Sequence, residues 1–314
     1  MQKITPNLWF DSDAEAAARL YASLIPGSRI GPITRYGKAG FEIHGRPEGS
    51  VMTVDFELGG VRFIALNGGP HFRFTPAISL FVVLETEAEV DRFWSRLSEG
   101  GSVLMPLDAY DWSPKYGWLS DRWGLSWQVA LGKRADVGQT VTPSLMFVGP
   151  QHGNAEAAIA FYTSLFDNSR VEGILRYDGS GKDPAGTVTH AQFYLDGEAL
   201  MAMDSALEHG FGFNEAVSLM ITCRDQAEID RFWAALSAVP AAEQCGWLKD
   251  RFGVSWQVVP ERMAAMMADP DPAKVARVTE AFLAMKKFDV AELERAFAGG
   301  PEARIPVAAG GTWP

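Results

Sequence analysis

The chain has 314 residues, of which 47% are hydrophobic and 21% charged, and its formal net charge at pH 7 is −11. This composition supports a sizeable core and excludes a disordered chain, and the length fits one large domain or two ordinary ones. The acidic balance argues against nucleic acid as a partner, because proteins bind it largely by neutralising phosphates.

The composition also limits the cellular context. The two cysteines, Cys223 and Cys245, are too few for a disulfide framework or a structural zinc site. No apolar run approaches the roughly 20 residues that span a bilayer. Residues 1–6 lack the basic and apolar regions of a secretory signal. We therefore expect a cytoplasmic protein without a membrane partner.

Five sequence blocks recur in the same order in the second half of the chain. Residues 4–10 correspond to 141–147, and the most similar pair is 117–129 (GWLSDRWGLSWQV) and 246–258 (GWLKDRFGVSWQV). Ordered matches of this kind indicate a tandem duplication. We predict a first module at 1–132, a second module at 141–260 and a C-terminal extension at 261–314.

Hydrophobic periodicity predicts the elements of each module. In the first module a strand leads through helix-capping residues into an Ala-rich helix, and Gly59-Gly60 joins two alternating strands. The expected elements are strands at 4–10, 51–58, 61–66, 78–84 and 125–131 and helices at 13–25 and 87–100. Strands this close in sequence pair mostly antiparallel, so we predict the α+β class with two repeated βαβββ modules.

The C-terminal extension has a helical pattern. We expect helices at 261–268, 272–287 and 290–297, separated by Asp- and Pro-containing turns. Apolar side chains of the middle helix fall on one face, which predicts that the extension docks on the modules.

Several blocks resemble a known family. They are residues 4–10 (ITPNLWF), 66–70 (LNGGP), 228–233 (EIDRFW) and 245–260 (CGWLKDRFGVSWQVVP). They are similar to the PhnB-like family, also labelled 3-demethylubiquinone-9 3-methyltransferase domain, of the vicinal-oxygen-chelate superfamily of glyoxalase, bleomycin-resistance and ring-cleaving dioxygenase proteins. The resemblance covers residues 1–260 and implies two βαβββ modules around a shared cavity.

The resemblance also implies where a metal ion would bind. Metal-using relatives hold a divalent ion on a His or Gln of the first strand and a Glu of the last strand of each module. Here Gln128 and Gln257 stand at the Glu positions, and the first-strand positions fall near Pro6 or Asn7 and near Pro143 or Ser144. Neutral amides and hydroxyls hold a divalent ion weakly. We expect no cofactor, with a divalent metal as the less favoured alternative.

The methyltransferase label does not fit the sequence. A methyl donor normally binds at a Gly-rich turn between a strand and a helix of parallel βαβ units. The nearest candidate, residues 179–186, contains Pro184 and is predicted to be a loop between strands. We therefore expect that the protein is not a methyltransferase.

One group of candidate site residues follows from strand alternation. His190, Gln192 and Tyr194 share the strand face that lines the cavity in the resembled fold. His190 there can act as a general base, and its neighbours can contact a ligand. The alternative interpretation is a strand histidine without chemistry. Asp55 and Glu57 occupy the corresponding face of the first module, either as acid, base or cation ligands or as a solvated strand face.

The last strands of the modules provide the other candidates. Gln128 and Gln257 share a face with Ser126 and Ser255, so we expect them to orient a ligand by hydrogen bonds. Trp118 and Trp247 are expected at the edge of the pocket, with core packing as the alternative. Trp127 and Trp256 point the other way and are expected in the core.

Three hypotheses about function remain open. The first is a metal-independent protein that binds a small-molecule ligand. The second is a lyase or isomerase acting on a carbonyl compound, with His190 as general base and a weakly held divalent ion. The third is an interaction protein whose cavity is filled with side chains. The sequence is equally compatible with a pseudo-two-fold monomer and with a homodimer.

Overall fold

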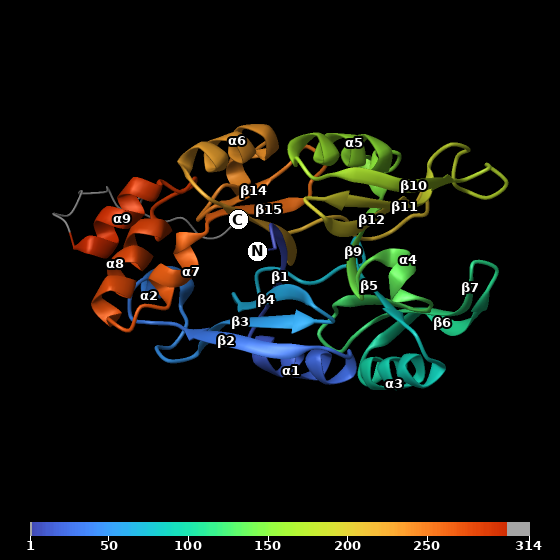
Figure 1. The fold of residues 1–314 in the computed structure, drawn as a ribbon, viewed down its shortest axis with the longest axis horizontal. Helices are drawn as coiled ribbons and strands as arrows, with labels where there is room; N and C mark the ends of the chain where they lie inside the picture. The colour runs from blue at the N-terminus through green and yellow to red at the C-terminus, as the bar shows by residue number, and fades with distance from the viewer. Residues whose placement is uncertain (1, 300–314) are drawn as a thin grey trace.

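The computed structural model describes residues 2–299 and contains the two predicted α+β modules and the helical extension (Figure 1). Each module is built from two consecutive units that start with a strand followed by a helix. The first unit comprises β1 (Ile4–Phe10), α1 (Ala14–Leu24), β2 (Arg29–Arg35), α2 (Phe41–His44), β3 (Val51–Leu58) and β4 (Val61–Asn67). The second comprises β5 (Ile78–Leu84), α3 (Glu87–Ser98), β6 (Ser102–Tyr110), β7 (Ser113–Ser120) and β8 (Ser126–Leu131).

The second module repeats this order. A linker with the short helix α4 (Arg134–Val137) leads into it. Its first unit comprises β9 (Val141–Phe147), η1 (Gly149–Gln151), α5 (Ala155–Leu165), β10 (Arg170–Arg176), β11 (Val188–Leu195) and β12 (Glu198–Asp204). Its second unit comprises β13 (Val217–Cys223), α6 (Gln226–Leu236), η2 (Pro240–Ala242), β14 (Trp247–Lys249) and β15 (Ser255–Pro260).

The two sheets are shared between the modules. Sheet A has seven strands in the order β14-β15-β13-β1-β4-β3-β2, and sheet B has eight in the order β10-β11-β12-β9-β5-β8-β7-β6. Sheet A is joined by the antiparallel pair β1 and β13, and sheet B by the antiparallel pair β5 and β9. Each sheet thus combines one unit of each module, so the modules pair within the chain.

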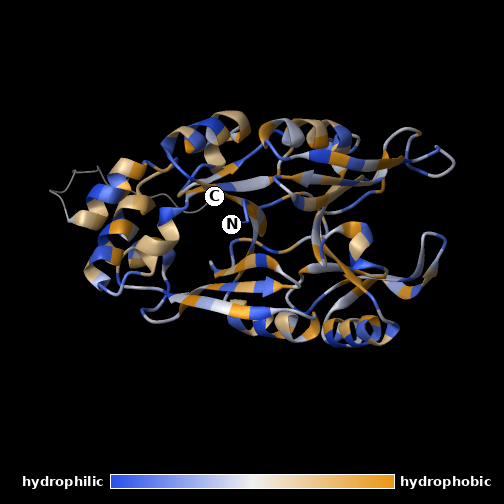
Figure 2. Cartoon of the chain, viewed as in Figure 1, coloured by the Kyte–Doolittle hydropathy of each residue, from blue (hydrophilic) through white to orange (hydrophobic). Residues whose placement is uncertain are grey.

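Helices α1, α3, α5 and α6 cover the outer faces of the sheets (Figure 1). The opposite, inner faces of the sheets are oriented toward the middle of the molecule. Amphipathic strands and helices produce this arrangement, as the alternation of hydropathy along α1 and α3 illustrates (Figure 2). The side chains that sequence alternation assigns to the core, including Val54, Phe56 and Trp127, are buried beneath the helices.

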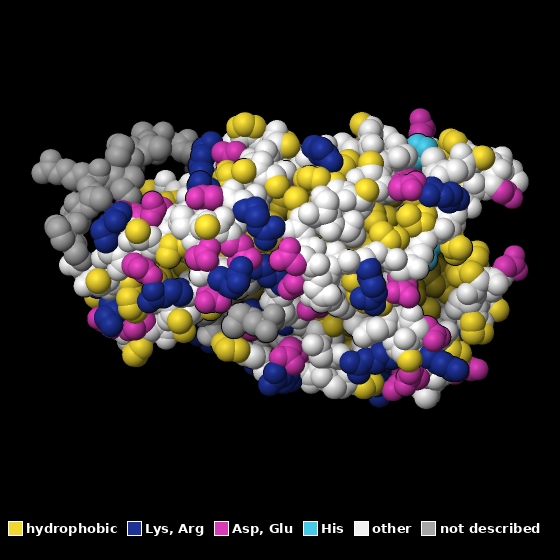
Figure 3. Space-filling view, turned by 45° about the horizontal axis from the view of Figure 1, so that its top comes forward, with side chains coloured by type: hydrophobic (Ala, Val, Ile, Leu, Met, Phe, Trp, Pro, Cys, Tyr) yellow, Lys and Arg dark blue, Asp and Glu magenta, His cyan; other side chains and the backbone are white. Residues whose placement is uncertain are grey.

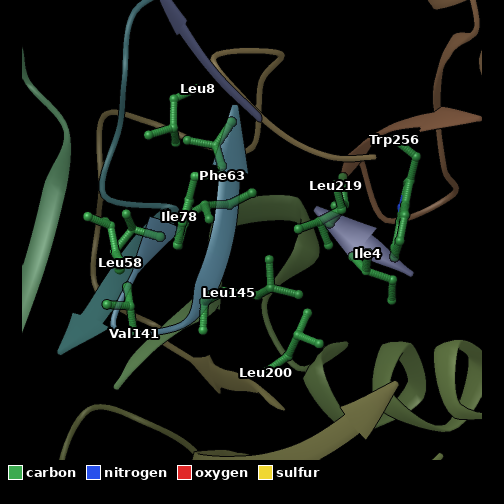
Figure 4. Packing of buried hydrophobic residues seen from close by; sticks show 14 of the residues in the cluster. Ile4, Leu8, Leu58, Phe63, Ile78, Val141, Leu145, Leu200, Leu219 and Trp256 are labelled. Atoms are coloured by element: carbon green, nitrogen blue, oxygen red, sulfur yellow. The ribbon is translucent and has the colours of Figure 1, made fainter. Parts of the chain in front are cut away.

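One hydrophobic cluster runs through both modules. Leu58 and Val141 belong to it, as do Ile4 and Leu219, although each pair joins different modules (Figure 4). Burial of this apolar surface at the module junction stabilises the paired arrangement. Trp127 and Trp256 are fully buried in this core, as expected from the sequence.

The extension lies beside β14, the edge strand of sheet A. The last unit of this sheet has no strand equivalent to β2, β6 or β10 among the described residues. The extension contains α7 (Arg262–Met267), α8 (Pro272–Leu283) and α9 (Val290–Ala298). Next to β14, the backbone N–H of Cys245 donates to Met285 O at 2.8 Å and that of Gly246 to Lys286 O at 2.7 Å. Buried Phe288 packs on Gly246, where a Cβ atom would lie 2.4 Å from its ring. The predicted docking of the extension is therefore confirmed for its described part, and residues 300–314 lie outside it.

Candidate functional site

Five side chains with uncharged polar groups lie on the inner face of sheet A. We call them floor A: Thr5, Asn7, Ser218, Ser255 and Gln257. Strand register places Asn7 opposite Ser218 and Ser218 opposite Ser255, so these three form one row across β1, β13 and β15. Gln257 follows in the next row, beside Met220. All five side chains are buried.

The duplicated positions on sheet B form floor B: Thr142, Ser144, Ser79, Ser126 and Gln128. Here Ser79 lies opposite both Ser144 and Ser126 in register. The two floors therefore have the same layout. They differ at one floor position, where Asn7 corresponds to Ser144, and at neighbouring positions that include Cys245, which corresponds to Tyr116, and Trp9, which corresponds to Met146.

On floor B, the polar groups of Gln128 and Ser126 form hydrogen bonds within the protein. Gln128 Nε2 donates to Ser79 Oγ at 2.7 Å, and the Tyr116 hydroxyl donates to Gln128 Oε1 at 2.7 Å. Trp118 Nε1 donates to Ser126 Oγ at 2.7 Å. The side chain of Gln128 thus has both a donor and an acceptor partner within the protein.

Floor A has fewer internal hydrogen bonds. Gln257 Nε2 donates to Ser218 Oγ at 2.9 Å, which repeats the bond between Gln128 and Ser79. Thr5 Oγ1, Asn7 Oδ1 and Ser255 Oγ are buried without a hydrogen-bond partner. Floor B has one such atom, Thr142 Oγ1.

Neither floor has the ligands that a divalent ion requires. Gln128 and Gln257 are on the floors, as expected from the sequence, but the side chains around them are amides and hydroxyls. Among residues 2–299, no group of three or more His, Cys, Asp or Glu side chains is arranged to hold a metal ion. Divalent ions prefer anionic or imidazole ligands, so these donor sets do not fit one.

Aromatic side chains border floor A. Trp9 packs edge-on against Trp247, with ring centroids 6.0 Å apart, and against Phe72 at 5.1 Å. Trp9 Nε1 donates to Gly69 O at 2.8 Å, which fixes the ring. Trp247 is buried beside floor A, and Trp118 is half-buried and donates to Ser126.

Gln192 and Tyr194 hold the linker between the modules. The Tyr194 hydroxyl donates to Val137 O at 3.0 Å, and Gln192 Nε2 donates to the same oxygen at 3.1 Å. The Arg170 guanidinium lies 3.6 Å from the centroid of the Tyr194 ring on its other side. These two predicted ligand-binding residues therefore contact the linker instead of lining an open cavity.

His190 lies on the same strand, β11, two residues before Gln192. Its side chain is exposed, and none of the described residues hydrogen-bonds or ion-pairs with it. Desolvation by the surrounding protein nonetheless lowers the pKa of His190, which favours the neutral ring at pH 7. The ring lacks a carboxylate that would orient it as a general base.

Asp55 and Glu57 form ion pairs with arginines. Acidic and basic side chains are intermingled on the face of the protein that Figure 3 shows. Asp55 Oδ1 accepts from Arg62 Nε at 2.6 Å, and Glu57 Oε2 accepts from Arg29 Nε at 2.9 Å. The hydrogen bond from Arg29 lowers the pKa of the Glu57 carboxyl. These carboxylates are paired along β2, β3 and β4 rather than gathered into a cation site.

Two further features, a surface hollow and the pair of cysteines, add no reactive group to the floors. A surface hollow of about 620 Å³ at the start of α1 includes Arg19 and Arg46 in its lining, but these are paired with Glu15 and Asp11. Burial raises the pKa of Cys223 to about 12 and that of Cys245 to about 11, so neither thiol is a ready nucleophile.

The sequence analysis did not identify Ser79, Ser218 and Tyr116 as partners of the glutamines. Their contacts join strands that are distant in sequence, so they depend on sheet register. A usable signal was present, because Ser79 and Ser218 occupy equivalent places of the duplication.

The paired units and their inner floors define a protein of the glyoxalase-like, vicinal-oxygen-chelate class. The model of the 3-demethylubiquinone-9 3-methyltransferase family matches residues 2–130 and again residues 139–259. The chain therefore belongs to this PhnB-like family, in tandem duplication.

Two solved structures are similar to this chain. A PhnB protein from Bacillus cereus, described by the same methyltransferase name, is 42% identical over 42% of this chain and 100% of its own, with a TM-score of 0.39. Glyoxalase I from Zea mays matches 82% of this chain and 93% of its own at 11% identity, with a TM-score of 0.50, and supports the fold alone. No curated protein matches this chain. Within residues 2–299, no helix is both long and apolar enough to cross a membrane.

Proposed function

We propose that the protein is a metal-independent, cytoplasmic small-molecule-binding protein of the glyoxalase and bleomycin-resistance type. The observation that carries the proposal is floor A, where uncharged polar atoms without a hydrogen-bond partner lie beside aromatic side chains. Ligand sites in proteins commonly combine a mainly apolar lining with a few fixed polar groups. The divalent-ion chemistry of glyoxalase-like relatives requires ligands that the floors do not provide.

The proposal excludes methyl transfer despite the family name. Residues 179–186 connect the antiparallel strands β10 and β11 and therefore do not form a strand-to-helix turn. A Gly-rich turn of that kind normally holds the methyl donor. The methyltransferase name describes the family. The function proposed for this chain rests on the side chains of floor A.

Native mass spectrometry with metal analysis of the same sample tests the proposal. We expect a metal-free chain, and either an organic adduct or saturable quenching of Trp fluorescence by some members of a panel of neutral aromatic compounds. A stoichiometric divalent ion contradicts metal independence. The absence of both adduct and saturable response contradicts ligand binding and favours the interaction-protein hypothesis.

A second candidate function is a lyase or isomerase acting on a carbonyl compound. The exposed side chain of His190 favours it, because a substrate can reach this ring and its neutral form can accept a proton. His190→Ala is then expected to abolish turnover of a carbonyl substrate while leaving the melting temperature unchanged. Unchanged turnover removes His190 as the base.

A further inference from the structure

The duplication places two copies of one polar floor in the same chain, so each serves as a control for the other. They share the serine and glutamine of their central hydrogen bond. Floor B adds the donors Tyr116 and Trp118, which satisfy Gln128 and Ser126. Floor A has Cys245 where floor B has Tyr116, and this shorter side chain makes no hydrogen bond to Gln257.

The result is a concentration of unsatisfied groups on floor A. Asn7 and Ser255 lie on either side of Ser218 in one row, and Asn7 Oδ1 and Ser255 Oγ lack hydrogen-bond partners. Thr5 Oγ1, in the adjacent row, also lacks a partner. Asn7 is 5% exposed, Ser255 1% and Thr5 0%. Native proteins rarely leave buried polar groups unpaired, so a cluster of three requires an explanation.

The chemistry of these atoms indicates what they would bind. Asn7 Oδ1 and Gln257 Oε1 accept hydrogen bonds, and the hydroxyls of Ser255 and Thr5 both donate and accept. Lys249, which lies opposite Ser255 in register, is paired with Glu215 at 2.7 Å. The polar atoms of floor A that lack a partner are therefore uncharged. A ligand that satisfies Asn7 Oδ1 must supply at least one N–H or O–H donor.

The surroundings add a requirement for shape. Trp9 and Trp247 meet edge to face beside the row, and aromatic rings pack favourably in this arrangement. A flat ring that carries a primary carboxamide matches both features, because its NH₂ group donates to Asn7 Oδ1 and its oxygen accepts from a hydroxyl.

Resting on the proposed function, we infer that floor A is the ligand-recognition site, that floor B is a structural copy, and that the ligand is a neutral aromatic carboxamide or a compound with the same donor pattern. Floor B has lost recognition because Tyr116 and Trp118 already bond to the polar groups of Gln128 and Ser126. One chain then binds one ligand, although the fold is duplicated.

The test is calorimetric titration of the full chain with benzamide, and with benzoate and benzamidine as charged compounds of similar shape. We expect benzamide to bind at one site per chain and at least tenfold more tightly than either charged compound. Asn7→Ser, which introduces the residue of floor B, and Ser255→Ala are each expected to weaken benzamide binding at least tenfold. Ser126→Ala, the matched change on floor B, is expected to alter it less than twofold.

Other outcomes separate the two proposals. Loss of binding in Ser126→Ala with retention in Asn7→Ser overturns the assignment to floor A and leaves the binding function standing. If benzoate or benzamidine binds as tightly as benzamide, the ligand is not restricted to neutral carboxamides and this part of the proposal is overturned. The same holds if other panel compounds bind and benzamide does not. Failure of every compound, with no adduct in native mass spectra, overturns the binding function itself. Thermal melts of each variant establish that it is folded.

Discussion

The hydroxyl of Tyr21 in α1 donates to Asp121 Oδ2 at 2.6 Å, which joins the first unit to the turn before β8 in the second. Trp127 Nε1 donates to the same oxygen at 3.0 Å, and the backbone N–H groups of Trp123 and Leu125 donate to Oδ1. Tyr162, Asp250 and Trp256 repeat the arrangement in the second module. The Asp-x-x-Gly turn is thus a buried structural junction. Burial raises the pKa of both carboxyls, although the surrounding donors partly offset it.

Removing the tyrosine hydroxyl from this junction is expected to destabilise the fold. Tyr21→Phe leaves the buried carboxyl with one donor fewer and should lower the free energy of unfolding by about 2 kcal/mol. Tyr162→Phe should cost a similar amount, and the two changes should add because they share no partner. Urea unfolding of the single and double variants measures both effects. A loss below about 0.5 kcal/mol for Tyr21→Phe would contradict a structural role for this bond.

The floors predict a difference in stability that needs no ligand. Ser126→Ala removes the acceptor of Trp118 Nε1 and should cost about 1 kcal/mol. Ser255→Ala removes a buried hydroxyl without a partner, so the unliganded protein should be unchanged or slightly more stable. Thermal and urea melts of ligand-free protein compare the matched pair. Equal destabilisation by both changes would show that Ser255 has a partner in the folded protein.

The C-terminal extension is expected to be part of the folded core. Met266, Phe288 and Leu293 belong to the hydrophobic cluster of the modules, so a chain ending at residue 260 should expose apolar surface and aggregate. Phe288→Ala in the full chain should cost about 3–5 kcal/mol. Glu280→Ala, an exposed position on α8, is the control and should have little effect. A soluble, monodisperse truncated chain would contradict this assignment.

The sequence predicted most elements that carry a buried face, but not β7, which is partly buried. The strand Ile4–Phe10, the helix of α1 and the alternation of Val54, Phe56 and Leu58 follow from apolar periodicity, which reports burial on one side. Edge strands lack that signal. β2 contains Gly31 and Pro32 and β6 is largely exposed, so neither gives a periodic pattern, although both pair with a neighbour in the sheet.

The site was predictable only in part, for a related reason. Strand alternation placed Gln128 and Gln257 on the inner faces, because alternation is a local property. It could not show that Gln192 and Tyr194 bind the carbonyl of Val137, since that contact depends on the path of the linker. Nor could it distinguish the two floors, because the contacts of Tyr116 on β7 and the place of Cys245 before β14 depend on how the strands pair.

Glu198 at the module junction predicts a pH dependence of stability. It lines a void of about 10 Å³ with residues of β1 and β9, among them Ile4, Pro6 and Pro143. Burial, with the nearby charge of Asp196, raises the pKa of Glu198 to about 7 from its ordinary 4.5. Between these values the folded chain keeps a proton that the unfolded chain has lost. Its contribution to stability is therefore complete below pH 4.5 and is lost as pH rises through 7.

Glu198→Gln keeps a neutral side chain at every pH and should remove this dependence. The variant should match the wild type near pH 4.5 and exceed it by about 1 kcal/mol at pH 8, a value reduced for the partial exposure of the group. Urea midpoints of both proteins at the two pH values measure the difference. Asp196→Asn is a second variant, because removing its charge should lower the pKa of Glu198 and weaken the dependence. Asp196 has a positive φ of 50°, which asparagine tolerates well, so folding should be retained. An unchanged gap between the wild type and Glu198→Gln at both pH values would show that the carboxyl is solvated at the junction.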